Sequence, residues 1–424
     1  MWLDRPIFLL LLLLLSLVAL SSTHAQVRNG GRPTTKTTPR LEELRAQGSE
    51  ALYNLDYDVA RQRFTELNRL YPEDPIGPQL LATTLWLEEL NRARRLQAAI
   101  YSTQSFYAKT EEKPDPRLIQ DFGDLTRLAT RLATARLRLN LRDTQALYVL
   151  GTTEFLKASF AATVERRFLA ALRYATSGLD KHREVMKLDP NFHDAELSIG
   201  MYDYIVGTLP LPARILAGIA GRRGSKKRGI QTLERVTTEG HWMRDDAKVL
   251  LIAIYKREKH FPEALALSRE LHQRYPRNYL LSLETADALI SLAALDRQTR
   301  SKESDSMERE ALDTFEELSR GRPTADDSPR ALDLINFRYG EALLLMNQPG
   351  RAAEKFLAAA AVRRADAGLV SRAHLLAAQA FDIAGKRHEA LDEYRMVLSR
   401  PNVYDSHDQA RRGLKKPYTG QSQK

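Results

Sequence analysis

The chain has 424 residues, with 64 lysines and arginines against 54 aspartates and glutamates, and no cysteine. The absence of cysteine excludes a thiol nucleophile, a thiolate metal site and any lipid anchor that needs an acylated cysteine. Glycine and proline number only 21 and 18, and Ala, Leu, Arg and Glu are abundant, which is typical of helical proteins.

The first 25 residues predict a secretory signal peptide. They carry Arg5 near the start, an unbroken apolar run from Ile7 to Leu20, and a small-residue cleavage site ending at Ala25. The run is shorter than the roughly 20 residues of a membrane-spanning helix, so an uncleaved anchor is the second choice. We therefore expect a protein exported to the periplasm or cell envelope, with a mature chain that begins near Gln26.

Residues 26–40, QVRNGGRPTTKTTPR, predict a flexible linker, because glycine, proline and threonine dominate them. For an exported protein, the formal charge of +10 favours anionic membrane surfaces or acidic proteins as partners, and no nucleic acid is expected. A dispersed, solvated surface charge is the alternative explanation.

From Leu41 onward the apolar residues recur with helical spacing. One pattern of small and aromatic residues is also repeated several times along the chain. In its first occurrence Gly48 and Ala60 would let two antiparallel helices approach, while Tyr57 and Phe64 would fill the space between them. The later sets are Tyr255, Phe261, Ala264 and Pro276; Gly340, Ala352 and Phe356; and Ala378, Phe381, Gly385, Ala390 and Tyr394.

These residues resemble the tetratricopeptide repeat (TPR), a helix–turn–helix unit of about 34 residues. The resemblance implies an all-α fold over residues 41–415: a right-handed α–α superhelix of about eight TPR-like helical pairs with a C-terminal capping helix at 404–415. Residues 416–424 are expected to be a disordered tail. The segment from Asp189 to Gly240 also resembles the middle of bacterial envelope TPR proteins and of the inclusion-body-clearance, or tetratricopeptide outer-membrane, family. Because members of those families are mostly adaptors, this resemblance implies no reaction.

Nothing in the sequence predicts an enzyme, a cofactor or a metal site. The histidines beyond the signal peptide lie singly, and no two are spaced four apart as on a zinc-binding helix. Gly218, Gly221 and Gly224 suggest a phosphate-binding loop, but the Lys-Ser/Thr that such a loop requires does not follow them. A Gly-x-Ser-x-Gly nucleophile motif is absent as well.

Two carboxylates occupy unusual places in the repeat. Glu154 and Asp203 fall where a large aromatic residue normally packs between paired helices, so each is expected to be partly buried and to need a partner. The basic residues within reach are Arg166, Arg167 and Arg173 for Glu154, and Arg214 or Arg228 for Asp203. The two acids could belong to an ion-pair network that fixes the middle repeats, or to a polar site for a small anionic or lipid-like ligand.

Residues 208–228, TLPLPARILAGIAGRRGSKKR, interrupt the repeat pattern as an irregular insertion. Pro210 and Pro212 should end the preceding helix, and a short apolar helix should follow before a basic turn. Three interpretations stay open: an extra helix packed on the array, an element that dips into a membrane surface, or a docking site for another protein. The residues of this candidate membrane or partner patch are Leu211, Ile215, Arg222, Arg223, Lys226, Lys227 and Arg228.

TPR arrays usually bind peptides on the concave face formed by the first helix of each pair. The candidate residues for this face are Arg45, Tyr53, Tyr148, Tyr204, Lys256, Arg257, Phe337, Glu341 and Gln379. The asparagine of the carboxylate-clamp version is missing, so a clamp for chaperone tails is not expected. The sequence therefore predicts an exported, non-catalytic scaffold for protein–protein contacts in the cell envelope, and the alternative is a lipid- or membrane-surface-binding protein that uses residues 209–228.

Overall fold

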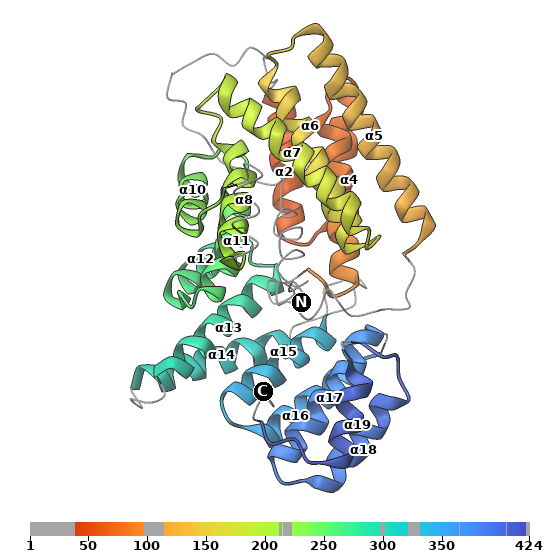
Figure 1. The fold of residues 1–424 in the computed structure, drawn as a ribbon, viewed down its shortest axis with the longest axis vertical. Coiled ribbons are helices and arrows are strands. Elements are labelled where there is room, and N and C mark those ends of the chain that lie inside the picture. The colour runs from red at the N-terminus through yellow and green to blue at the C-terminus, as the bar shows by residue number, and fades with distance from the viewer. Residues whose placement is uncertain are drawn as a thin grey trace. The chain divides into compact units, whose positions relative to one another are not determined.

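The computed structural model describes residues 39–96, 114–211, 214, 223–296, 302–320, 331–363, 365–403 and 405–420. The predicted signal peptide lies outside these residues, as does the predicted linker except for Pro39 and Arg40, which begin the first helix. All regular secondary structure in the described residues is helical, which confirms the all-α prediction (Figure 1).

The helices follow one another as eight successive pairs and one last helix within the described ranges, as the repeat pattern predicts. The first four pairs are α2 (Pro39–Tyr53) and α3 (Tyr57–Leu70), α4 (Ile76–Arg92) and α5 (Pro116–Leu139), α6 (Thr144–Thr163) and α7 (Phe168–Leu188), and α8 (Glu196–Thr208) and α10 (Lys226–Glu239). A short 3₁₀ helix, η3 (His193–Ala195), precedes α8.

The remaining pairs are α11 (Arg244–Arg257) and α12 (Phe261–Arg274), α13 (Tyr279–Asp296) and α14 (Lys302–Arg320), α15 (Leu332–Leu345) and α16 (Pro349–Ala360), and α17 (Ala367–Ile383) and α18 (Arg387–Leu398). The last helix is α19 (Ser406–Lys415). It lies within the predicted capping segment 404–415.

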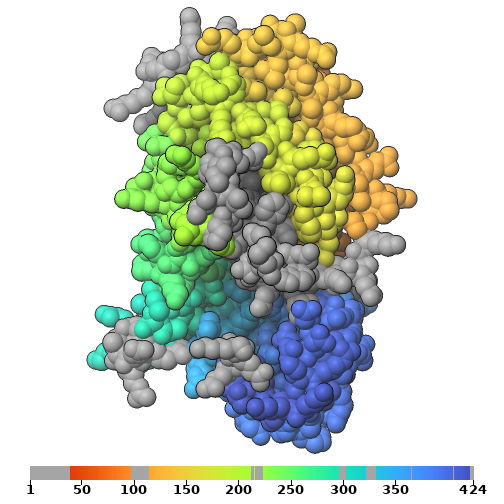
Figure 2. Space-filling model, viewed as in Figure 1, coloured from red at the N-terminus to blue at the C-terminus, as the bar shows by residue number. Residues whose placement is uncertain are grey.

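The described residues divide into two compact units. Unit 1 holds those up to Arg92, those of 114–254, and the short stretch 273–278. Unit 2 holds 93–96, 255–272 and the described residues from Tyr279 onward. Figure 2 shows the face of unit 1 that α5 and α7 form, in orange and yellow, and the C-terminal helices of unit 2 in blue.

Paired helices approach closely where glycine on one faces an aromatic ring on the other. A Cβ atom added to Gly340 of α15 would lie 2.7 Å from the ring of Phe356 on α16. Gly48 faces Phe64 of α3 in the same way, and Gly413 of α19 faces Tyr394 of α18. The small and aromatic residues of the sequence pattern are therefore in contact, and the same arrangement seats the last helix.

Close glycine contacts also bring α8 and α10 together. A Cβ on Gly224 would lie 2.5 Å from Cβ of Val206, and one on Gly200 would lie 3.1 Å from the carbonyl oxygen of Gly229. Ser225 caps α10 by accepting a hydrogen bond from the backbone of Arg228 at 3.3 Å. Gly224 therefore serves helix packing. Of the short apolar helix predicted after Pro212, only Arg214 lies within the described residues.

The predicted tail 416–424 is described as far as Gly420, and it contacts α17 within that stretch. The backbone of Tyr418 donates to the carboxylate of Asp382 at 2.8 Å. That buried carboxylate also accepts from Tyr394 at 2.9 Å and pairs with Arg387 at 2.8 Å. Asp382 thus anchors the chain beyond α19.

Candidate functional site

The first helix of unit 1 contacts residues far along the chain. Nε1 of Trp242 donates to the Glu42 carboxylate at 3.2 Å across 200 residues, and the Arg45 guanidinium stacks on the Trp242 ring at 3.7 Å from its centroid. The rings of Tyr53 and Tyr275 stack with centroids 4.6 Å apart. Repeats in an open array contact only their neighbours, so unit 1 differs from such an array.

The turn after α2 extends this long-range contact. The Asn54 side chain accepts a hydrogen bond from the backbone of Arg277 at 3.2 Å, and the carbonyl oxygen of Tyr53 accepts one from the Asn278 side chain at 2.7 Å. Arg277 also pairs with Asp56. These contacts cover the inner end of α2, where the sequence predicted an accessible groove.

The concave-face prediction is therefore wrong for several residues of unit 1. Arg45 is 3% exposed, Tyr148 1% and Tyr204 0%, so these side chains are buried, and Tyr53 is half-buried beneath Tyr275. For Arg45 and Tyr53 the physical reason is the contact of Trp242 and Tyr275 with α2, which a register of short repeats does not reveal. Tyr148 is instead covered by His182 and Phe192.

The inner face of α2 is polar although it is buried. Arg45 and Ser49 lie one turn apart on it, 3% and 1% exposed. Burial lowers the pKa of Arg45 despite the opposing charge of Glu42. Within the described residues the Arg45 guanidinium has no hydrogen bond or ion pair beyond its stacking on Trp242, and Oγ of Ser49 has no hydrogen bond.

Tyr148 of α6 adds a third such group. Its ring stacks on His182 at 5.0 Å and lies 4.9 Å from the ring of Phe192, while its hydroxyl makes no hydrogen bond to the described residues. Burial and the charge of Asp194 raise the pKa of Tyr148 well above its usual value, and Arg45 opposes the shift. The phenol therefore stays protonated close to the Arg45 charge.

His182 of α7 is a buried, neutral histidine that joins three helices. Its Nε2 lies 3.2 Å from the carbonyl oxygen of Tyr148, to which it donates, and its Nδ1 lies 2.8 Å from the hydroxyl of Ser198 on α8. Burial lowers the pKa of His182 to about 4. The approach of α6 depends on Gly151, because a side chain there would overlap the imidazole ring.

The loop that carries Trp242 is held by one buried carboxylate. Oδ1 of Asp194 accepts hydrogen bonds from the backbone of His241 at 2.8 Å and from those of Trp242 and Met243, both at 2.9 Å. Asp194 itself is 4% exposed, on η3. Three charge-assisted bonds therefore set the position from which the indole reaches α2.

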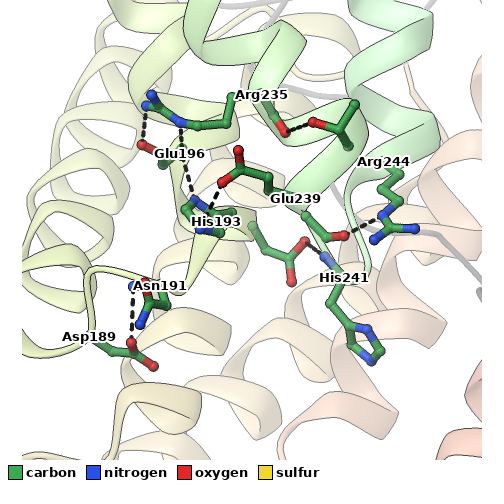
Figure 3. A network of polar contacts seen from close by, with 11 residues as sticks. Asp189, Asn191, His193, Glu196, Arg235, Glu239, His241 and Arg244 are labelled. Atoms are coloured by element: carbon green, nitrogen blue, oxygen red, sulfur yellow. Dashed lines mark hydrogen bonds and ion pairs between the residues drawn. The ribbon is translucent and has the colours of Figure 1, made fainter. Parts of the chain in front are cut away.

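Beside this loop lies a half-exposed network, which Figure 3 shows. His193 lies 3.0 Å from Glu196 and 3.1 Å from Glu239, and Arg235 of α10 donates to Glu196 at 2.9 Å. Burial would raise the pKa of Glu196, but the hydrogen bonds from Arg235 and His193 outweigh it and lower that pKa. This network ties η3 to α10 around Asp194.

Unit 2 carries a row of alternating charges on the first helices of four successive pairs, α11, α13, α15 and α17. We call this row the charge ladder. Lys256 of α11 lies 2.5 Å from Glu284 and also pairs with Asp287, both on α13. Arg338 of α15 lies 3.1 Å from Asp287 and 2.7 Å from Glu341. The last member, Arg372 of α17, lies 3.7 Å from Glu341 and above the ring of Phe337.

The charge ladder is partly accessible. Exposed fractions run from 9% for the Glu284 side chain to 29% for Arg372. Burial alone would raise the pKa of Asp287, but the charges of Lys256 and Arg338 outweigh it and lower that pKa to about 2. The predicted groove residues Lys256, Phe337 and Glu341 therefore lie together here. Arg257 is exposed, and Gln379 is half-buried beside Gln409.

The two unusual carboxylates are buried as predicted, but they form separate ion pairs. Glu154 pairs with Lys157, one turn along its own helix, at 2.7 Å, so the predicted arginine partners on the next helix are wrong. Lys157 reaches back because its ammonium also lies over the ring of Tyr174, 4.3 Å from the centroid. Asp203 pairs with Arg228 at 2.7 Å, one of its two predicted partners.

The basic patch is described in part. Leu211 is 60% exposed, and Arg223 and Lys227 are exposed, whereas Arg228 is engaged by Asp203. Ile215 and Arg222 lie outside the described residues. In the part of the chain that the structure describes, no helix has the length and apolarity to cross a membrane, and no three His or acidic side chains are grouped as for a metal ion.

No protein-family model and no curated protein matches the chain. Two human IFIT1 dimer structures are similar to it. The one with m7Gppp-AAAA is 12% identical, with 98% of this chain and 86% of that chain covered and a TM-score of 0.45. The one with PPP-AAAA is 13% identical, with coverages of 89% and 82% and a TM-score of 0.44. Yeast Tom70 is 11% identical, with 87% of each chain covered and a TM-score of 0.35. Similarity at this level says nothing about what the chain binds.

Proposed function

We propose that the chain is a non-catalytic, exported repeat scaffold of the cell envelope that binds another protein through the charge ladder of unit 2. The observation that carries the proposal is the ladder itself, in which charges from α11, α13, α15 and α17 alternate on successive first helices. The side chains of such a row can exchange their ion pairs with one another for ion pairs with a partner segment of mixed charge.

The accessible end of the ladder is where a partner would gain most. Arg372 and Glu341 are 3.7 Å apart and keep 29% and 27% of their side-chain surface exposed. Arg372 also covers Phe337, so a partner that engages the guanidinium could reach an aromatic ring as well.

A site-specific photocross-linker tests the proposal. Placed at Gln379 of α17, near this end of the array, it should yield one discrete cross-linked protein in the native envelope. The control position is Glu389, which is exposed on the second helix α18. Combining the Gln379 probe with Glu341→Lys and Arg372→Glu should remove the product. Equal products from both positions, or a product that survives the charge reversal, would refute the proposal.

The basic patch supports a second candidate function, binding to an anionic membrane surface. The first turn of α10 is formed by Lys226, Lys227 and Arg228, and this turn contains no acidic residue. A cation at a helix N-terminus opposes the helix dipole, so the exposed Lys227 is unfavourable for α10 itself, whereas Arg228 is engaged by Asp203. Leu211 is exposed nearby in the sequence.

Vesicle flotation tests this second candidate. Arg223→Glu with Lys227→Glu should abolish binding to vesicles that contain an anionic lipid, because each basic residue near such a surface contributes about 1 kcal/mol. Arg411→Glu with Arg412→Glu on α19 is the control for an equal change of net charge. Equal losses in both variants would contradict a dedicated patch.

A further inference from the structure

Several buried polar groups lie on or against the inner face of α2. We call Glu42, Arg45, Ser49, Tyr148 and Trp242 the Arg45 cluster. They come from three places in unit 1: α2, α6 and the loop held by Asp194. The contacts of Trp242 with both Glu42 and Arg45 bring that loop against α2.

The cluster leaves several buried hydrogen-bonding atoms unused. In the described part of the chain, Oγ of Ser49, the hydroxyl of Tyr148 and Oε1 of Glu42 make no hydrogen bond, and the Arg45 guanidinium makes none either. More than nine-tenths of buried polar groups in proteins find a partner. Three such atoms beside the Arg45 charge therefore indicate a binding site rather than a packing accident.

The charge of Arg45 is especially costly for the fold alone. A buried charge normally has a counter-ion, because desolvation is not otherwise repaid. The nearby acids are already engaged: Oε2 of Glu42 accepts from Trp242, and Oδ1 of Asp194 accepts three backbone N–H groups. Neither acid forms an ion pair with Arg45.

The chemistry of these atoms defines the ligand. A guanidinium stacked on an indole keeps its edge free for an in-plane, bidentate oxyanion. The unused hydroxyl groups of Ser49 and Tyr148 can each donate a hydrogen bond to an oxyanion, whereas Oε1 of Glu42 can only accept. We propose that the Arg45 cluster binds a small organic acid whose carboxylate meets Arg45 and whose hydroxyl or ammonium group meets Glu42.

The burial of the cluster limits the size of the ligand. Arg45, Ser49 and Tyr148 are each at most 3% exposed, so an extended peptide does not reach them in this conformation. This proposal is independent of the scaffold function assigned to unit 2, and either can fail alone.

Calorimetry and thermal unfolding on the chain purified from its native source test the proposal. The probes are glycolate and glycine, which carry both groups, acetate, which lacks the donor, inorganic phosphate, and chloride at equal ionic strength. Glycolate or glycine should bind saturably and raise the unfolding temperature, and acetate should bind at least about threefold more weakly. Stronger binding of phosphate would overturn the assignment to an organic acid. No binding of any probe would overturn the site.

Arg45→Met separates a binding role from a structural one. It should weaken binding at least about tenfold while the ligand-free unfolding temperature stays the same or rises, because an unpaired buried charge is removed. A fall in that temperature with unchanged ligand affinity would overturn the proposal.

A matched pair of tyrosine variants keeps the proposal testable if Arg45→Met does not fold. Tyr148→Phe removes a hydroxyl of the cluster and should weaken binding by about threefold to tenfold. Tyr202→Phe removes another buried hydroxyl without a hydrogen bond, on α8 beneath Arg183, and should leave affinity unchanged. Equal effects of the two variants would refute the role of Tyr148.

Discussion

Units 1 and 2 use the same helical pairs but treat the inner face of the first helix differently. In unit 1 the inner face of α2 is covered by Trp242 and Tyr275, so Arg45 is 3% exposed. In unit 2 the corresponding charges pair with one another from helix to helix and keep up to 29% of their side-chain surface. A repeat fold can thus bury its inner face or leave it partly open without a change in the pairs themselves.

The unfolding of each unit can be followed by a separate probe. Of the three tryptophans, Trp86 and Trp242 belong to unit 1, and Trp2 lies in the predicted signal peptide. Tryptophan fluorescence of the mature chain therefore follows unit 1, whereas hydrogen exchange of peptides from residues 279–420 follows unit 2.

The strongest test of the covered arrangement is Asp194→Ala. It leaves three backbone N–H groups of the Trp242 loop without their acceptor, and we expect a loss of about 3 kcal/mol in the free energy of unfolding of unit 1. Urea titration followed by fluorescence measures it. Asp189→Ala is the control, because Asp189 accepts one exposed hydrogen bond, from Asn191. A similar loss in both variants would show that Asp194 does not hold the loop.

Acid should weaken unit 1 first, through His182. Its pKa is about 4 when folded and about 6.5 when unfolded, so the unfolded state binds the proton more readily. The stabilisation is complete above pH 6.5 and falls by about 3 kcal/mol as the pH drops from 6.5 to 4. Fluorescence-detected urea titrations across this range measure the slope. His182→Gln should flatten it, and a steep slope that survives the substitution would contradict this assignment.

Unit 2 should respond to acid only at lower pH, through Asp287. Its pKa is about 2 when folded against 3.8 as the ordinary value, so the stabilisation is present above about pH 4 and declines as the pH falls through 2. The expected loss is about 2 kcal/mol. Hydrogen exchange of α13 and α15 at pH 5, 3.5 and 2.5 measures it. Asp287→Asn should remove the dependence, and a loss already complete at pH 5 would be inconsistent with the ladder.

These two units also mark how far the sequence could predict the structure. Helical pairs and their contacts, such as Gly340 on Phe356, follow from local spacing and were predicted correctly. The grouping of Lys256, Phe337 and Glu341 followed from the repeat register, since equivalent positions of neighbouring first helices lie side by side.

The covered face of unit 1 could not be predicted in this way. The contact between Glu42 and Trp242 spans 200 residues, so no local spacing in the sequence indicates it. The partner of Glu154 was missed for a local reason. The repeat pattern favoured arginines of the next helix, whereas the partner is Lys157, one turn along the same helix.

The smallest effect should come from the exposed ion pair between Arg277 and Asp56, which is part of the long-range contact of α2. Arg277 pairs with Asp56, but its side chain is 62% exposed, and exposed pairs contribute about 0.5 kcal/mol or less. Arg277→Ala should therefore barely change the urea midpoint of unit 1, and the change should match that of Arg127→Ala, which breaks an exposed pair within α5 of the same unit. A loss near that of Asp194→Ala would mean that surface charge, rather than the buried contacts of Trp242 and Tyr275, holds the Trp242 loop and residues 273–278 against α2.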